Sequence, residues 1–106
     1  MTNSLIALVV RFNFADAAAV EGFDALVAET VEQIREREPG TLVYATHTVE
    51  GEPLARVFYE VYASRDAFDA HEQQPHTLRF LAEREKFVDS FRVEFLTPGA
   101  AKGMPA

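Results

Sequence analysis

The stretch "TLVYATHTVEGEPLARVFYEVYA", residues 41–63, decides the fold. Its two halves, 41–49 and 55–63, are rich in Thr, Val, Tyr and Phe, and their apolar residues lack the three- and four-residue spacing of a helix. Between them "EGEP", residues 50–53, supplies turn-forming residues. We therefore expect two neighbouring strands that form a hairpin.

A strand and a helix are expected before this hairpin. Residues 5–14, "LIALVVRFNF", are rich in β-branched and aromatic residues on both faces, which is typical of a strand buried on two sides. Asp16 is a suitable cap for a helix that Pro39 and Gly40 end. Within it apolar residues recur at three- and four-residue steps: Val20, Phe23, Val27, Val31 and Ile34.

Helices and a last strand are expected after the hairpin. Ser64 can cap a helical region that begins near Arg65, and Pro75 breaks or kinks it. A further helix is predicted to carry Leu78, Leu81, Glu85 and Val88. The segment "SFRVEFL", residues 90–96, alternates apolar with charged residues and is predicted to be a strand.

The order of these elements predicts an α+β protein with the ferredoxin-like β-α-β-β-α-β arrangement, a four-stranded antiparallel sheet with helices on one face. We expect a single domain over residues 1–98 and a flexible tail over 99–106. The helices leave one sheet face uncovered, although the first and third strands carry large apolar residues on both faces. A homodimer through the open sheet face would bury that surface.

Composition excludes several classes of function. The 106 residues are 48% hydrophobic and include nine Phe, which is enough for a core. The net charge of -7 and the lack of a basic cluster argue against nucleic acid as a partner. The chain has no cysteine, hence no disulfide, thiolate metal site or cysteine nucleophile. It shows no signal peptide and no apolar run long enough for a membrane, so we expect a cytoplasmic protein.

Polar residues gather where the third strand leads into the second helix. Strand alternation places Phe58, Glu60 and Tyr62 on one face. Glu60 is then either exposed or in an apolar site where desolvation raises its pKa, and its apolar neighbours favour the buried position. His71 follows Phe68 by three residues and so shares its inward helical face. It is either a core histidine or a catalytic base with a partner on the strand beneath.

Three further polar residues are candidates. His76 follows Pro75 at a helix start, where its ring either caps the helix or faces a pocket mouth. His47 and Asn13 are polar residues within apolar strands. The hexapeptide "HEQQPH" differs from the zinc motif HExxH, because its histidines are five apart with a proline between them. A metal site built from His47, His71, His76 and Glu60 stays conceivable, but no ligand spacing supports it, and we expect neither metal nor cofactor.

Four segments together resemble the antibiotic biosynthesis monooxygenase superfamily over nearly the whole chain. They are "EPGTLVY" (38–44), "YEVYAS" (59–64), "DAFDAHEQQPH" (66–76) and "FRVEFLTPG" (91–99). The most specific part is Glu-x-Tyr at 60–62, followed by His71 and the Pro75-His76 pair. The resemblance implies a dimeric α+β barrel with a pocket between sheet and helices in each subunit. It also implies an activity like that of the quinol monooxygenases in this superfamily, which oxidise hydroquinones or phenolic rings with O2 and without metal or flavin.

Other branches of this superfamily give alternatives. The isomerase that acts on phosphorylated autoinducer-2 is similar in the same motif, so plain proton transfer is the second hypothesis. The haem-degrading branch has a Trp in the place of Tyr62 and an axial His near residues 80–81, and this chain has neither. A non-catalytic dimeric module that binds a small molecule is the third hypothesis.

The resemblance to the first two branches implies proton abstraction in a dry pocket. His71 is then the base, Glu60 orients it and stabilises the imidazolium, and Tyr62 bonds the developing phenolate or peroxide oxygen. An apolar wall is expected from Phe58, Phe80 and Tyr44. Near the motif the cations are Arg65 and Arg79, so the predicted partners are O2 and a small uncharged aromatic substrate.

Overall fold

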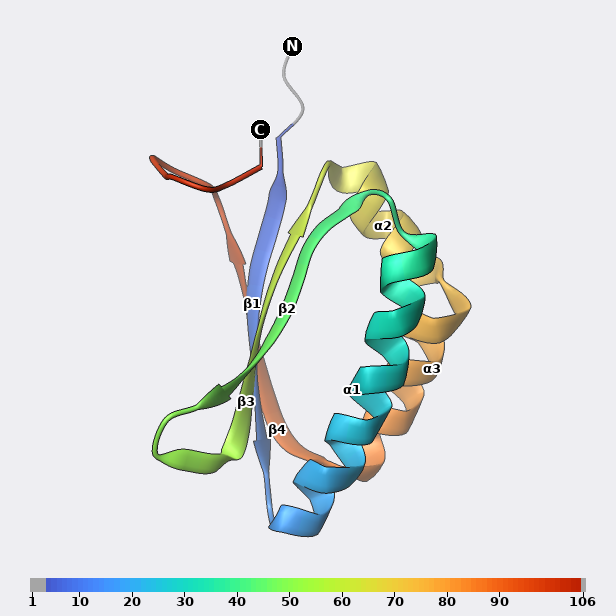
Figure 1. Cartoon of the computed structure of the whole chain (residues 1–106), viewed down its shortest axis with the longest axis vertical. Coiled ribbons are helices and arrows are strands. Elements are labelled where there is room, and N and C mark those ends of the chain that lie inside the picture. Colours follow the sequence, from blue (N-terminus) through green and yellow to red (C-terminus); the bar gives the residue numbers. More distant parts are fainter. Residues whose placement is uncertain (1–3, 106) are drawn as a thin grey trace.

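The computed structural model describes residues 4–105, so residues 1–3 of the predicted domain and residue 106 of the predicted tail lie outside the described residues. Figure 1 shows one sheet with helices on one side of it. In chain order the elements are β1 (Ile6–Phe14), α1 (Ala17–Arg37), β2 (Thr41–Val49), β3 (Glu52–Tyr62), α2 (Arg65–Gln73), α3 (Pro75–Glu83), the 3-10 turn η1 (Arg84–Lys86) and β4 (Val88–Leu96).

The four strands form one antiparallel sheet in the order β2-β3-β1-β4. The predicted ferredoxin-like fold is therefore confirmed, with its second helical region divided into α2 and α3. None of the helices within residues 4–105 is long and apolar enough to cross a membrane.

The predicted helix boundaries at Asp16, Ser64 and Pro75 are confirmed. Asp16 Oδ1 accepts a hydrogen bond of 2.9 Å from the Ala19 N–H, and Ser64 Oγ accepts one of 3.1 Å from the Ala67 N–H. These bonds satisfy backbone donors that the first helical turn leaves free. Pro75 occupies the first turn of α3, where its missing N–H costs nothing.

Two expected boundaries differ in the structure. The helix predicted to reach Val88 ends at Glu83, because Val88 already pairs with Phe14 in the sheet. The third strand begins at Glu52, three residues before the expected Ala55. Pro53 is tolerated near the start of this strand because the pairing of β3 with β1 extends only to Ala55. Pro53 lies beyond that pairing, so no hydrogen bond to β1 is lost through its missing N–H.

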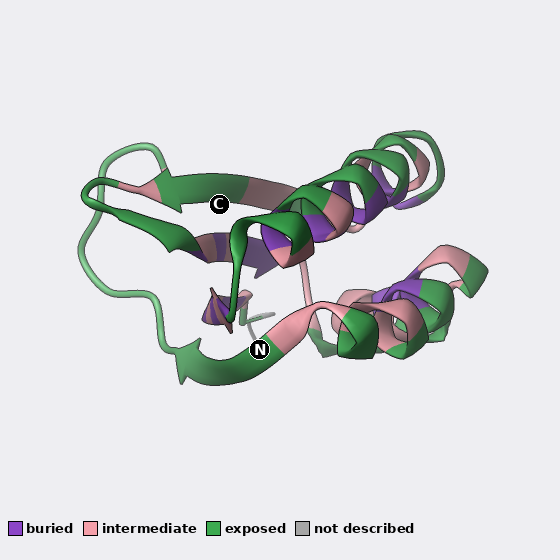
Figure 2. Ribbon diagram, turned by 90° about the horizontal axis from the view of Figure 1, so that it is seen from below, coloured by how far each residue is buried: buried purple, intermediate pink, exposed green. Residues whose placement is uncertain are grey.

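The core lies between the helices and one face of the sheet, where Figure 2 shows buried residues on the inward sides of the helices. It is built around aromatic rings. The Phe12 ring lies 5.0 Å from Phe23 and 4.9 Å from Phe58, in tilted and edge-to-face geometries. Each such pair contributes about 0.5–1.5 kcal/mol beyond the area it buries. Phe80 of α3 packs on the same cluster and fixes that helix against the sheet.

The strand register separates the residues of the helix-covered face from those of the open face. Leu8, Val10 and Phe12 of β1 face the helices, opposite Phe95, Val93 and Phe91 of β4. The helices do not cover β4, so these three apolar side chains remain 60%, 39% and 50% exposed. Intervening residues such as Val9, Arg11 and Tyr59 lie on the open face. There the Tyr59 hydroxyl donates a hydrogen bond to Met104 Sδ at 3.1 Å, which ties part of the C-terminal segment to the sheet.

Candidate functional site

His71 lies on the inward side of α2 and is 5% exposed. Its ring packs between two tyrosines of the hairpin, with centroids 5.7 Å from Tyr44 and 5.1 Å from Tyr62. The Ser64 cap and the break at Pro75 fix both ends of this short helix. The expectation that His71 points inward from a capped helix is therefore confirmed.

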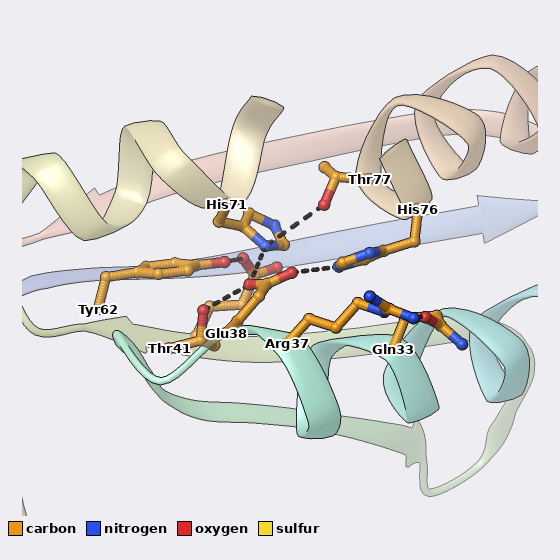
Figure 3. Close-up of polar contacts among 9 residues, drawn as sticks. Gln33, Arg37, Glu38, Thr41, Tyr62, His71, His76 and Thr77 are labelled. Carbon is orange, nitrogen blue, oxygen red and sulfur yellow. Dashed lines mark hydrogen bonds and ion pairs between the residues drawn. The ribbon is translucent and has the colours of Figure 1, made fainter. Parts of the chain in front are cut away.

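A residue that the sequence analysis did not single out holds the imidazole. Glu38 follows the last turn of α1 and is 8% exposed. His71 Nδ1 lies 2.7 Å from Glu38 Oε1, and His76 Nε2 bonds the other carboxylate oxygen (Figure 3). Thr41 Oγ1 also donates to Oε1 at 2.6 Å. Three side chains from three segments therefore converge on one buried carboxylate.

The hydrogen bonds determine the charge of Glu38. Burial by itself raises the pKa of this carboxyl, but the hydrogen bonds from His71, Thr41 and His76 outweigh it and lower the pKa below its ordinary value. Glu38 is accordingly ionised at neutral pH. An ionised acceptor on Nδ1 holds a proton there and leaves Nε2 of His71 as the basic nitrogen.

Glu60 bonds Tyr62 and not His71. The Tyr62 hydroxyl donates to Glu60 Oε1 at 2.6 Å, and no hydrogen bond joins Glu60 to His71 within the described residues. Burial raises the pKa of Glu60, and burial followed by the charge of Glu60 raises that of Tyr62. The carboxylate that contacts His71 is therefore Glu38 and not the expected Glu60, because the end of α1 brings Glu38 to Nδ1 while Glu60 bonds its own strand neighbour.

An apolar cavity of about 220 Å³ lies between the sheet and α2, α3 and η1. His71, Glu60 and Tyr44 line it with Phe80, as expected, and β4 adds the exposed side chains of Phe91, Val93 and Phe95. Burial and then the charge of Glu60 raise the pKa of Tyr44 well above its ordinary value, so its hydroxyl stays protonated as a donor.

Two other predicted residues lie beside this cavity without lining it. Phe58 is 1% exposed in the aromatic core, and its ring contacts Tyr44 at a centroid distance of 5.8 Å. Tyr62 is fully buried behind His71, and its hydroxyl is already committed to Glu60. Both side chains support the cavity wall from behind. Of the two tyrosines, Tyr44 lines the cavity and the expected Tyr62 does not.

The structure does not bring His47 and Asn13 to the cavity. His47 pairs with Val57 and Asn13 with Ala55, positions that alternate away from the helix-covered Phe58 and Glu60. His47 Nδ1 bonds the Val57 carbonyl, while Asn13 bonds Arg11 and Ser90. Polarity alone suggested these residues, but the strand period of two places them on the opposite face. Residues 4–105 contain no group of three His, Cys, Asp or Glu arranged to hold a metal, so the conceivable four-residue metal site is not assembled.

Arg84 is a second residue that the sequence analysis missed. It lines the cavity from η1, with its guanidinium carbon 4.5 Å from the Phe91 ring centroid and 5.9 Å from that of Phe12. Within residues 4–105 it forms no ion pair with a carboxylate. Burial lowers its pKa, but a guanidinium keeps its charge in proteins. The cavity therefore combines His71, one cation and the carboxyl groups of Glu60 and Glu72 within a mostly apolar wall.

Solved structures of similar shape cover almost the whole chain. A Bacteroides thetaiotaomicron protein, itself described only provisionally as an antibiotic biosynthesis monooxygenase, has 22% identity and a TM-score of 0.86 over 97% of this chain and 96% of its own. Rv0793 from Mycobacterium tuberculosis has 26% identity and a TM-score of 0.83 over 92% of this chain and 98% of its own. SnoaB, a cofactor-independent oxygenase from Streptomyces nogalater, has 20% identity and a TM-score of 0.80 over 95% and 99%.

The family relationship rests on sequence as well as shape. No curated protein matches this chain. The family model for antibiotic biosynthesis monooxygenase, however, matches residues 5–83, which include β1, the three α-helices and the β2–β3 hairpin but not η1 or β4. The chain therefore belongs to the antibiotic biosynthesis monooxygenase family.

Proposed function

We propose that this protein is a cofactor-independent monooxygenase that oxidises a hydroquinone or a related phenolic ring with O2. The observation that carries the proposal is His71, whose Nδ1 is bonded to the buried Glu38 carboxylate while its ring lines an apolar cavity. This arrangement suits a general base for a weakly acidic hydroxyl. SnoaB, of similar fold, is a cofactor-independent oxygenase, which supports the same chemistry here.

Deprotonation starts the proposed reaction. His71 Nε2 takes the proton of one ring hydroxyl, and the resulting anion gives one electron to O2. The semiquinone and superoxide combine to form a carbon–oxygen bond, and the imidazolium returns its proton to the peroxide. Loss of the C–H proton and cleavage of the O–O bond then release water and leave a new ring carbonyl. The ring supplies all the electrons, so one hydroquinone and one O2 give one hydroxyquinone and one water.

Two further groups stabilise the anions formed on this route. The Tyr44 hydroxyl is a protonated donor that lines the cavity with His71. The Arg84 guanidinium lines the same cavity. Both favour negative charge on a phenolate or peroxide oxygen within an apolar environment, where such interactions are strongest.

Arg84 also favours a second candidate function. A free cation in the cavity suits an anionic ligand, so a proton-transfer isomerase acting on a phosphorylated substrate is the alternative. His71 would then move a proton between two carbon positions without oxygen. Arg65 and Arg79 are the cations near the motif in sequence, and the position of Arg84 in the cavity strengthens this alternative.

We also propose that two copies associate through the open sheet face, as the family resemblance implies. The half-buried Val9, Val57 and Tyr59 on that face support a symmetric apolar contact. Each subunit would keep its own cavity on the helix-covered side.

Oxygen consumption tests the proposed activity. Purified protein should consume O2 with at least one member of a panel of hydroquinones and polycyclic phenols, and ¹⁸O₂ should label the product ring. Turnover of a phosphorylated hydroxyketone without oxygen would instead establish the isomerase. A protein that binds an aromatic ligand but turns over neither class would be the non-catalytic module, and the oxygenase proposal would be rejected.

A further inference from the structure

The Glu38 carboxylate lies between two separate spaces. His71, on its Oε1 side, lines the apolar cavity under the sheet. His76, on its Oε2 side, lines a groove on the outer surface between α1 and α3, together with Gln33, Arg37 and Arg79. Figure 3 shows the two rings reaching the carboxylate from different sides, His71 from α2 and His76 from α3. One buried anion therefore lies between the cavity under the sheet and the groove on the outer surface.

Each ring keeps one nitrogen free. His71 bonds Glu38 and Thr77 through Nδ1, and His76 bonds Glu38 through Nε2. Within residues 4–105 no fully buried side-chain nitrogen or oxygen lacks a hydrogen-bond partner. The other nitrogen of each ring therefore retains open space beside it, Nε2 of His71 toward the cavity and Nδ1 of His76 toward the groove.

Charge balance links the two rings. The cluster contains one ionised carboxylate, which a single imidazolium neutralises. Two imidazoliums would leave a net positive charge on a nearly buried cluster, and none would leave an unbalanced anion; both states are costly. A cluster with one cationic ring avoids both costs, and the two histidines would then compete for a single proton.

We infer that His76 is the proton-exchange residue of this site: when His71 takes a proton from the substrate hydroxyl, His76 releases its own proton into the groove. This inference rests on the proposed function. The substrate O–H bond breaks and an N–H bond forms at His71 Nε2, while the N–H bond at His76 Nδ1 breaks and water in the groove takes that proton. The cluster keeps its charge, and no electron moves in this exchange.

Other charged groups around the two rings act on the exchange. His71 is faced by Tyr44 of β2, Glu60 and Tyr62 of β3, and Glu72 of its own helix, and Arg84 of η1 lines the same cavity. A negative Glu60 favours the cation on His71, which is the direction that the exchange requires, whereas the Arg84 guanidinium opposes it. The groove beside His76 is lined by charged residues of α1 and α3, namely Glu29, Glu32, Arg37 and Arg79. Glu29 pairs with Arg79 at 3.0 Å; the guanidiniums of Arg37 and Arg79 favour release of the His76 proton, and the carboxylates of Glu29 and Glu32 oppose it.

Nitrogen-15 NMR of the histidine rings tests the coupling without any substrate. The chain has three histidines, and His47, outside the cluster, is an internal reference. In wild type, His71 should titrate in two steps, because its protonation depends on that of His76. His76→Gln, whose amide can still donate to Glu38, should lose the second step and leave the His47 curve unchanged. An identical His71 curve in wild type and His76→Gln would overturn the inference.

Calorimetry without oxygen tests the release itself. A hydroquinone that binds should release about one proton per site from wild type, measured from the dependence of the binding heat on the ionisation enthalpy of the buffer. His76→Gln should bind but lose this release, and release that persists in this variant would contradict the inference. If no hydroquinone supports oxygen uptake, the proposed function fails while the NMR coupling still stands. If a hydroquinone does support oxygen uptake but the NMR titrations of His71 and His76 are independent, the proposed function stands and only the role of His76 in proton exchange is rejected.

Discussion

Glu38 lies at the C-terminal end of α1, where the helix dipole destabilises a negative charge. The carbonyl groups at the end of α1 give this terminus partial negative charge, and the last turn accordingly carries Arg35 and Arg37. The carboxylate is stable there because His71, His76 and Thr41 all bond it. An acidic residue directly after a helix and before a Pro-Gly turn was therefore a signal, visible in the sequence, that the residue has partners elsewhere in the fold.

His71 is the first residue to test. His71→Ala should slow oxygen uptake by about two to four orders of magnitude, the usual contribution of a general base. The variant should still fold, which circular dichroism can check, although it leaves a small cavity. Gln73→Ala, an exposed position on the same helix, is the matched control and should retain wild-type rates. Full activity of His71→Ala with a competent substrate would remove His71 from the mechanism.

Glu38 and Glu60 should change the free energy of unfolding in opposite directions as the pH rises. The pKa of Glu38 is lower in the folded than in the unfolded chain, so its stabilisation is present above its ordinary value of 4.5 and is lost as the pH falls through the folded pKa. The pKa of Glu60 is raised above 4.5, so the folded protein holds this proton more tightly. Stability is therefore lost as the pH rises from 4.5 through the folded pKa of Glu60.

Glutamine variants separate these effects. At pH 7 Glu38→Gln should lower the free energy of unfolding by about 1.5–3 kcal/mol, the contribution of a buried hydrogen bond to a charged group. Glu60→Gln keeps an acceptor for Tyr62 without a buried charge, so it should be neutral or stabilising at pH 7. Urea unfolding of both variants and wild type across this pH range provides the comparison. Destabilisation of Glu60→Gln at pH 7 would contradict the account of its burial.

The short helix α2 is the element that positions the base, and its first turn depends on one side chain. Ser64→Ala should lower the free energy of unfolding by about 1 kcal/mol through loss of the cap on Ala67. The same variant should also lower activity, because α2 carries His71. Asp16→Ala removes the equivalent cap from α1 at the end far from the site (Figure 1), so it should cost similar stability without affecting turnover. Equal activity losses in both variants would mean that only global stability matters.

Sequence patterns predicted the elements of this fold better than the contacts between them. Caps and helix breaks are local, so Asp16, Ser64 and Pro75 were interpreted correctly from their neighbours. Which acid reaches His71 depends on how the end of α1 meets α2, and no periodicity encodes that distance. Gly40 illustrates the point, since an added Cβ there would lie 2.7 Å from the Ala67 Cβ. The close approach that places Glu38 beside His71 is a tertiary property.

At the scale of the whole molecule, two apolar surfaces within residues 4–105 could form the interface of a dimer. One is the open sheet face with Val9, Val57 and Tyr59, and the other is the exposed side of β4 with Phe91 and Phe95. The open face also carries charges, for example Arg11, which pairs with Glu52 at 2.6 Å. A symmetric dimer can keep such charges at its rim while it buries the apolar residues, which favours this face as the interface.

The predicted homodimer can be checked together with the face that forms it. Light scattering after size exclusion at micromolar concentration should give twice the 11.8 kDa mass of one chain. Val57→Asp puts a charge in the middle of the open face and should yield a monomer, because an unpaired buried charge is too costly for the interface. Phe95→Asp on β4 is the matched control and should remain dimeric. A monomeric wild type would reject the homodimer, and a monomer from Phe95→Asp alone would place the interface on β4 beside the cavity mouth.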